Sequence, residues 1–228
     1  MSAVETPVSP YEIFSDPAAA AIAEALVEGD IGRVRTLSAA ADSAALAALG
    51  DRRVTLLQWA LFNRSLDGMQ VLLDAGADPA QPGMDGDTVV HFACMLEEPQ
   101  FLQALLAHGA DPNVANADTG AAPLRAALMT EREEQFRILL AAGADPDHAD
   151  YMGNTPLHVT GLINEPQRAL DLLKAGADPV RRNAQDVTFQ RYLFMTRPDL
   201  LDADTSRAWE EVLTWLLEHD IPLDTAPV

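Results

Sequence analysis

The chain has 228 residues, of which 48% are hydrophobic and 6% aromatic, so it is long and apolar enough to bury a core. Its 35 acidic and 15 basic residues give a formal charge of −20, and such a negative surface repels the phosphate backbone of nucleic acids. No stretch approaches the roughly 18 unbroken apolar residues of a membrane-spanning helix, and the single cysteine excludes an internal disulfide. We therefore expect neither a nucleic-acid partner nor a membrane.

The N-terminal part of the chain is expected to be irregular. Residues 1–15 are predicted to form a tail without the basic start or the apolar centre of a secretion signal. This predicts a cytoplasmic protein, or a periplasmic one if a signal has been removed. Residues 18–37 have the pattern of a degenerate helix pair, and the alanine-rich segment 38–50 is expected to be a partly helical connection.

Two short motifs then recur with one period. The first reads Leu-Leu-x-x-Gly-Ala-Asp-Pro and occurs at 72–79, 105–112, 139–146 and 172–179, with its glycines 33, 34 and 33 residues apart. The second is clearest as Gly-Asn-Thr-Pro-Leu-His at 153–158. Its third residue falls at 155, and in weaker copies at positions 55, 88, 122 and 188.

Each motif has a local structural meaning. Thr155 can cap a helix, and Pro156 then occupies the first helical position, where no N–H is needed. Gly143 follows an apolar run and can end a helix in the left-handed conformation, after which Asp145-Pro146 begins an extended turn. Each unit is therefore predicted to be a helix, a short turn, a second helix and a projecting loop.

A period of about 33 residues with these two motifs resembles the ankyrin repeat, strongly over residues 50–180 and weakly towards both ends. The resemblance implies an all-α ankyrin-repeat solenoid of about six helix pairs with degenerate N- and C-terminal caps, in a single domain over residues 16–223. The expected units are 16–42, 51–79, 85–112, 119–146, 152–179 and 184–223. The last pair is expected at Thr188–Met195 and Trp209–Glu218, with an insertion over Thr196–Arg207.

Several polar residues could suggest chemistry, and each has a structural alternative that we favour. His91 and His158 share one repeat position and could suggest a metal site, but ankyrin repeats use this histidine to brace a neighbouring loop. Gln58 and Arg125 at the same position favour hydrogen bonding over metal ligation. The aspartates of the first motif could suggest calcium, but turn formation before proline explains them better. Cys94 is expected to be a small core residue. We expect no metal, no cofactor and no catalytic residue.

An unusual apolar stripe marks the first helices. Seven residues after the motif threonine the ankyrin family usually carries a polar residue, and this chain has Phe62, Met95, Met129, Leu162 and Met195. Leu96 and Ile163 extend the stripe, while the projecting loops add Met84, Asp85, Tyr151 and Met152. An apolar centre with an acidic rim is typical of a protein-binding site. The alternative is that these side chains turn inward and fill gaps between first helices.

The resemblance implies a non-catalytic module that grips a protein partner in its concave groove and has no small-molecule substrate. An inhibitor or immunity-type protein is the favoured role, and a scaffold, accessory or chaperone-like protein supporting a partner enzyme is the alternative. The charge of −20 favours a basic partner. The composition, with Lys174 as the only lysine, suggests a GC-rich bacterial genome.

Overall fold

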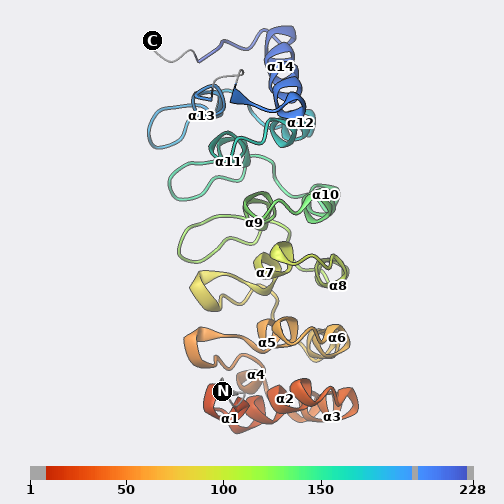
Figure 1. Cartoon of the computed structure of the whole chain (residues 1–228). Helices are drawn as coiled ribbons and strands as arrows, with labels where there is room; N and C mark the ends of the chain where they lie inside the picture. Colours follow the sequence, from red (N-terminus) through yellow and green to blue (C-terminus); the bar gives the residue numbers. More distant parts are fainter. Residues whose placement is uncertain (1–8, 197–199, 225–228) are drawn as a thin grey trace, which may run out of the picture. The chain divides into compact units, whose positions relative to one another are not determined.

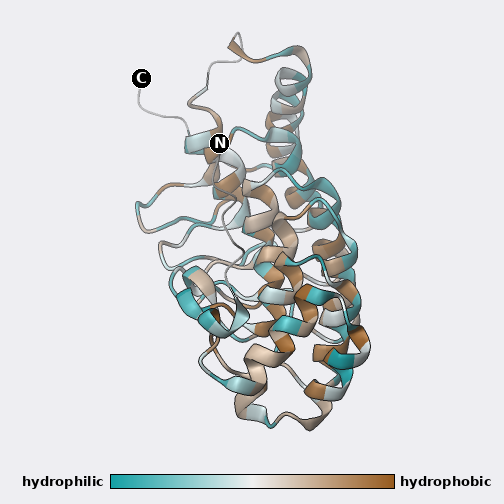
Figure 2. Ribbon diagram, turned by 60° about the horizontal axis from the view of Figure 1, so that its bottom comes forward, coloured by the Kyte–Doolittle hydropathy of each residue, from teal (hydrophilic) through white to brown (hydrophobic). Residues whose placement is uncertain are grey.

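The computed structural model describes residues 9–196 and 200–224, and every regular element within them is a helix. The predicted all-α class is confirmed. The chain divides into two compact units, Met1–Asp118 (unit 1) and Thr119–Val228 (unit 2), each of which is described by itself. In both units hydrophobic residues concentrate along the helices, whereas the loops are mostly hydrophilic (Figure 2).

Unit 1 contains three helix pairs. They are α2 (Pro17–Glu28) with α3 (Ile31–Ala40), α5 (Leu56–Phe62) with α6 (Leu66–Asp74), and α7 (Val89–Met95) with α8 (Gln100–Ala107). The connections hold the short helices α1 (Pro10–Ile13) and α4 (Ser43–Leu46) and the 3-10 turns η1 (Asp51–Arg53) and η2 (Met84–Gly86). First helices pack on first helices, α2 on α5 and α5 on α7, and second helices on second helices, α3 on α6 and α6 on α8 (Figure 1).

The described part of the predicted N-terminal tail is folded. Ser9 caps α1, and Phe14, which follows it, is buried. The Phe14 ring meets the Trp59 ring edge-on, with centroids 5.9 Å apart. This segment therefore covers part of the first regular pair, whereas residues 1–8 lie outside the described residues.

Within residues 119–196 and 200–224, unit 2 forms three further pairs. They are α9 (Pro123–Met129) with α10 (Glu133–Ala141), α11 (Pro156–Leu162) with α12 (Pro166–Lys174), and α13 (Phe189–Leu193) with α14 (Ala203–Glu218). Here α9 packs on α11, α11 on α13 and α12 on α14 (Figure 1). The prediction that the last helix begins at Trp209 is wrong. Asp202 accepts hydrogen bonds from the N–H groups of Asp204 and Thr205, which lets the helix begin at Ala203.

The glycine of the first motif ends each second helix as predicted. Its φ is positive at all four places, +95° at Gly76, +81° at Gly109, +86° at Gly143 and +96° at Gly176. The alanine after each glycine donates its N–H to the carbonyl oxygen of the residue five positions earlier, which is the first leucine of the motif. An example is the Ala144 N–H, which lies 2.9 Å from the Leu139 carbonyl oxygen. This 6→1 hydrogen bond belongs to the Schellman motif, which satisfies an end carbonyl and turns the chain into the loop.

The second motif also has one backbone shape. The residue two before each first-helix cap has positive φ throughout: +65° at Arg53, +73° at Gly86 and Gly120, +75° at Gly153 and +59° at Asp186. Thr55, Thr88 and Thr155 then form capping boxes with the side chain three residues later. The repeated sequence therefore sets both ends of the helix pair.

The segment after α14 makes the contacts with α13 that a following loop makes with the first helix in the other repeats. The Asp224 carboxylate accepts hydrogen bonds from the N–H and the hydroxyl of Thr188 at 3.3 and 3.0 Å. Gln190 donates its side-chain amide to the Pro222 carbonyl at 3.2 Å and accepts from the Asp224 N–H at 2.9 Å. Residues 222–224 thus provide hydrogen-bond partners for Thr188 and Gln190 at the start of α13.

Replacing Asp224 by alanine should loosen the start of α13, because Thr188 loses its acceptor. A net loss of about 1 kcal/mol corresponds to a fall in melting temperature of about 2–4 °C. Calorimetry and amide hydrogen exchange of α13 would measure this. Asp224→Asn keeps an acceptor oxygen and should stay close to wild type; equal losses in both variants would show that the contact does not stabilise the helix.

Candidate functional site

The side chain three residues after the motif threonine braces the next loop. The Thr155 N–H donates to His158 Nδ1 at 3.2 Å, while His158 Nε2 lies 3.0 Å from the Val187 carbonyl of the following loop. Since Nδ1 accepts, Nε2 carries the proton, and the ring is held in its neutral form. Gln58 does the same in unit 1, donating to the Asp87 carbonyl at 2.8 Å. These contacts agree with the predicted hydrogen-bonding role.

Burial lowers the pKa of His158, although its hydrogen bond to Val187 opposes the shift. The folded-state pKa therefore lies below the value of about 6.5 expected for the unfolded chain. Between these two values the unfolded chain binds more protons than the folded one, so acid favours unfolding.

We expect the buried neutral His158 to make its full contribution to the free energy of unfolding above about pH 6.5. This contribution should decrease as the pH falls towards the lowered pKa of the folded state. Urea unfolding between about pH 5 and 7.5 would measure this as the difference between wild type and His158→Gln. The glutamine copies Gln58 and does not titrate. A difference that does not change with pH would contradict the expectation.

The motif aspartates form turns. Each carboxylate accepts the N–H two residues later at 2.8 to 2.9 Å, in the turns after Asp78, Asp111, Asp145 and Asp178. This is the Asx turn expected from the sequence. Within residues 9–196 and 200–224, no group of three or more His, Cys, Asp or Glu side chains could hold a metal ion.

Cys94 is buried on α7, and its thiol pKa is raised by that burial and by the nearby Asp87 charge. A thiol held protonated in this way is a poor nucleophile. No helix in the described part of the chain combines the length and the apolar character that crossing a membrane requires.

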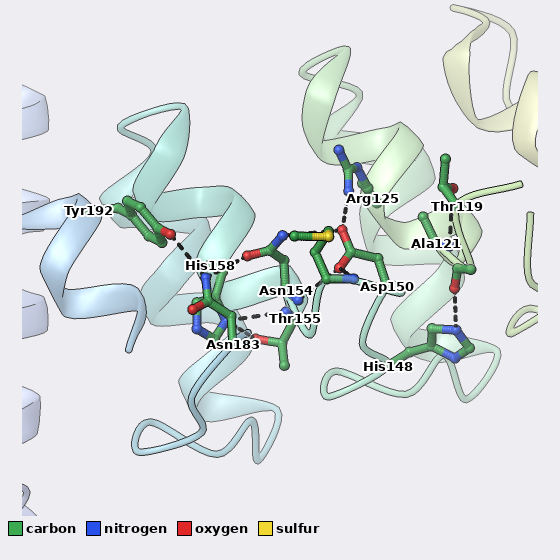
Figure 3. A network of polar contacts seen from close by, with 12 residues as sticks. Thr119, Ala121, Arg125, His148, Asp150, Asn154, Thr155, His158, Asn183 and Tyr192 are labelled. Atoms are coloured by element: carbon green, nitrogen blue, oxygen red, sulfur yellow. Dashed lines mark hydrogen bonds and ion pairs between the residues drawn. The ribbon is translucent and has the colours of Figure 1, made fainter. Parts of the chain in front are cut away.

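Arg125 replaces the bracing histidine in unit 2 and forms an ion pair. Its Nη1 lies 2.5 Å from Asp150 Oδ2, and the Asp150 side chain is only 6% exposed (Figure 3). The other Asp150 oxygen accepts the N–H groups of Met152 and Asn154 at 2.9 and 2.8 Å. The pair therefore connects α9 to the loop that follows α10.

That loop is also attached to both of its neighbours in unit 2. The Tyr151 N–H donates to the Thr119 carbonyl at 2.9 Å, and the Met152 carbonyl accepts from the Ala184 N–H at 2.8 Å. The Tyr151 ring lies over Gly120, where a Cβ atom would come within 2.5 Å of it. Glycine at this position therefore serves both the positive φ and the close approach of the ring.

Gly120→Ala should destabilise the protein more than Gly176→Ala. Both glycines have positive φ, but a Cβ at Gly176 meets nothing within 4 Å. The extra loss, about 1–3 kcal/mol for forced repacking, would be measured by urea unfolding and reports the contact with Tyr151. Equal losses would mean that the ring moves aside without cost.

None of the predicted partner-binding residues is fully buried. In unit 1, Phe62 and Asp85 are exposed, whereas Met84, Met95 and Leu96 are half-buried. The Phe62 ring meets the Phe92 ring edge-on at 5.2 Å.

In unit 2 the exposure is greater. Met129, Leu162 and Met195 are 53%, 56% and 69% exposed, Tyr151 and Met152 are exposed on their loop, and Ile163 is half-buried. Met129 and Leu162 are the last residues of α9 and α11, and Met195 lies two residues beyond α13. Since α9, α11 and α13 are successive neighbours, we describe these three side chains as the unit 2 stripe.

Acidic side chains lie at the turns that follow these first helices. Burial raises the pKa of Glu165, and the charges of Glu131 and Glu133 raise it further, although Arg168 opposes them. Arg168 donates to Glu133 and lowers the pKa of that carboxyl. Arg137 also pairs with Glu133, so this edge carries both charges, and Glu165 is the carboxyl whose pKa is raised.

Asp150 is the site residue that the sequence alone did not reveal. The available signal was its repeat position, five residues before the motif threonine, where the next unit has Asn183. An aspartate there, 25 residues after an arginine in the bracing position, indicates an ion pair in place of neutral hydrogen bonds.

Comparisons with known proteins agree with the repeat organisation. The family of ankyrin repeats (3 copies) matches residues 57–150 and 90–183. The chain is 48% identical to protein PhlB of Serratia liquefaciens over 157 residues, which are 69% of this chain and 66%, slightly under two thirds, of PhlB. The structure resembles the crystal structure of an ankyrin repeat domain from Acinetobacter baumannii AYE, with a TM-score of 0.69 and 23% identity, over 85% of this chain and 96% of that one.

Proposed function

The chain belongs to the ankyrin repeat family, and from that premise we propose that it is a non-catalytic protein that holds a partner protein on the exposed face of its first helices and loops. The observation that carries this proposal is the exposed apolar stripe of unit 2, formed by Met129, Leu162 and Met195. Ankyrin repeats imply a protein-binding module, and large apolar side chains grouped on such a surface are typical of an interface. Methionine adapts its shape to irregular partners.

A role without catalysis is supported by the way the reactive side chains are used. His158 braces a loop, the motif aspartates form turns, and Cys94 lies in the core with a raised thiol pKa. A catalytic group needs access to a substrate and a suitable pKa, and these side chains are instead committed to structural contacts.

The partner is proposed to be basic. The formal charge of −20 speeds the encounter with a basic surface, and Glu131 and Glu165 lie at the edge of the unit 2 stripe. An inhibitor or immunity-type protein is the favoured role. A scaffold or accessory protein that supports a partner enzyme uses the same surface and is the second candidate.

Met129→Glu together with Leu162→Glu should abolish partner binding and leave folding intact, because both side chains are more than half exposed. The probe is the product of the neighbouring gene, co-expressed and purified, with the dissociation constant measured by calorimetry. We expect a loss of about 100-fold or more, as for central interface residues. Leu217→Glu, on the exposed side of α14, is the control and should bind like wild type.

Each contrary result has a distinct meaning. A collapse of the melting temperature would show that the two residues belong to the core, and unchanged binding would show that the stripe is not the interface. Inhibition of the partner's activity at a one-to-one ratio would favour the inhibitor. Unchanged or increased activity in the complex would favour the accessory role.

A further inference from the structure

Unit 2 contains two versions of the same loop, one neutral and one charged. After α12, Asn183 Oδ1 accepts the N–H groups of Gln185 and Val187, two and four residues later, at 3.0 and 3.4 Å. After α10, one Asp150 oxygen accepts the N–H groups two and four residues later in the same pattern. An amide oxygen is therefore sufficient to shape this loop, and the fold itself does not need a carboxylate at Asp150.

What the carboxylate adds is a second oxygen that binds Arg125. The bracing residue on the preceding first helix changes together with the loop residue. Neutral His158 is found with Asn183, and charged Arg125 is found with Asp150. A charge-assisted hydrogen bond is stronger than a neutral one, and the Asp150 side chain is almost fully excluded from water. The charged version therefore adds an ion pair with α9, whereas in the neutral version the Asn183 amide donates to Asn154 Oδ1 and to the Tyr192 hydroxyl at 2.8 and 2.9 Å.

The residues between these anchors are the ones the loop displays. Tyr151 is 70% and Met152 57% exposed, although the backbone of each is hydrogen-bonded to a neighbouring loop. The Tyr151 ring is further restricted by its contact with Gly120. A backbone that is already held in place loses less entropy on binding, and a tyrosine side chain has few rotamers to lose, which are properties of an effective contact residue.

We propose that Arg125 and Asp150 are positioning residues that hold Tyr151 and Met152 ready as the specificity-determining contact of unit 2 with its partner. This inference rests on the proposed function and names the part of the surface that selects the partner. The fitting feature on the partner is an apolar side chain that packs against the phenol ring and the thioether.

The first test needs no partner. Arg125→His with Asp150→Asn replaces the charged pair by the residue types of His158 and Asn183. The acceptors of the Asn183 amide, Asn154 and Tyr192, correspond to Ala121 and Val159 in this loop, so the variant should fold with a somewhat lower melting temperature. The amides of Met152 and Asn154 should exchange with solvent about tenfold faster, as expected when a charged hydrogen bond is lost. In wild type this exchange should also rise modestly between roughly 0.05 and 0.5 M salt, because the Arg125 side chain is 40% exposed and salt screens a partly exposed ion pair, and in the variant it should not.

A purely structural role would give the same exchange and salt response but would leave partner binding unchanged, so the binding test below separates the two roles. Unchanged amide exchange in the double variant, or the same salt response in both proteins, would overturn the positioning role. Arg125→Lys retains the charge but not the planar guanidinium geometry, and its exchange should lie between the two.

The second test measures binding to the purified product of the neighbouring gene. Tyr151→Ser with Met152→Ser should weaken the dissociation constant at least about tenfold, and the Arg125→His with Asp150→Asn variant should weaken it less. If the serine variant binds like wild type while Met129→Glu with Leu162→Glu does not, the loop inference is overturned and the proposed function stands. If the glutamate variant also binds normally, the proposed surface itself is wrong.

Discussion

No helix pair in this protein can bury its apolar side without a neighbour, and the rest of the structure follows from that constraint. First helices such as α5, α7 and α11 have seven residues each, well below the roughly 12–15 residues needed for even marginal stability in water. Their order comes from packing on the next first helix. Left-handed glycines, capping boxes and Asx turns all contribute to this packing, because they fix the ends of each helix pair and lead the chain to the start of the next pair.

The bracing position shows where such a fold leaves freedom for function. Gln58 and His158 satisfy a carbonyl of the following loop with neutral donors, and either chemistry serves. Arg125 instead meets a buried carboxylate. This position can be occupied by an amide, an imidazole or a guanidinium, so it is constrained by geometry more than by chemistry. The residue in one repeat can therefore change for binding while the residues in the other repeats maintain the helix packing.

Features repeated in the chain could be predicted, and features that occur once could not. The class, the six helix pairs and the left-handed ends at Gly76 and Gly143 follow from local signals seen several times. Capping by Asp224 and pairing by Asp150 depend on residues 36 and 25 positions away, so no local pattern reports them. The helix start at Ala203 is not predictable from the repeats, because the Asp202 cap lies inside an insertion that has no second copy for comparison. The half-burial of Met95 depends on how neighbouring helix pairs pack, so the sequence does not predict it. Its place in the stripe follows from its position seven residues after the motif threonine.

The burial of Cys94 has a practical consequence for the study of this protein. Since the only thiol lies buried on α7 and is held protonated, maleimide dyes and thiol-reactive spin labels should not react with it in the folded state. A cysteine introduced on the surface, such as Leu217→Cys on the exposed side of α14, would then be the single thiol available for labelling. A fluorophore there would lie outside the proposed binding residues and could report, by its change in anisotropy, the binding and release of a partner protein.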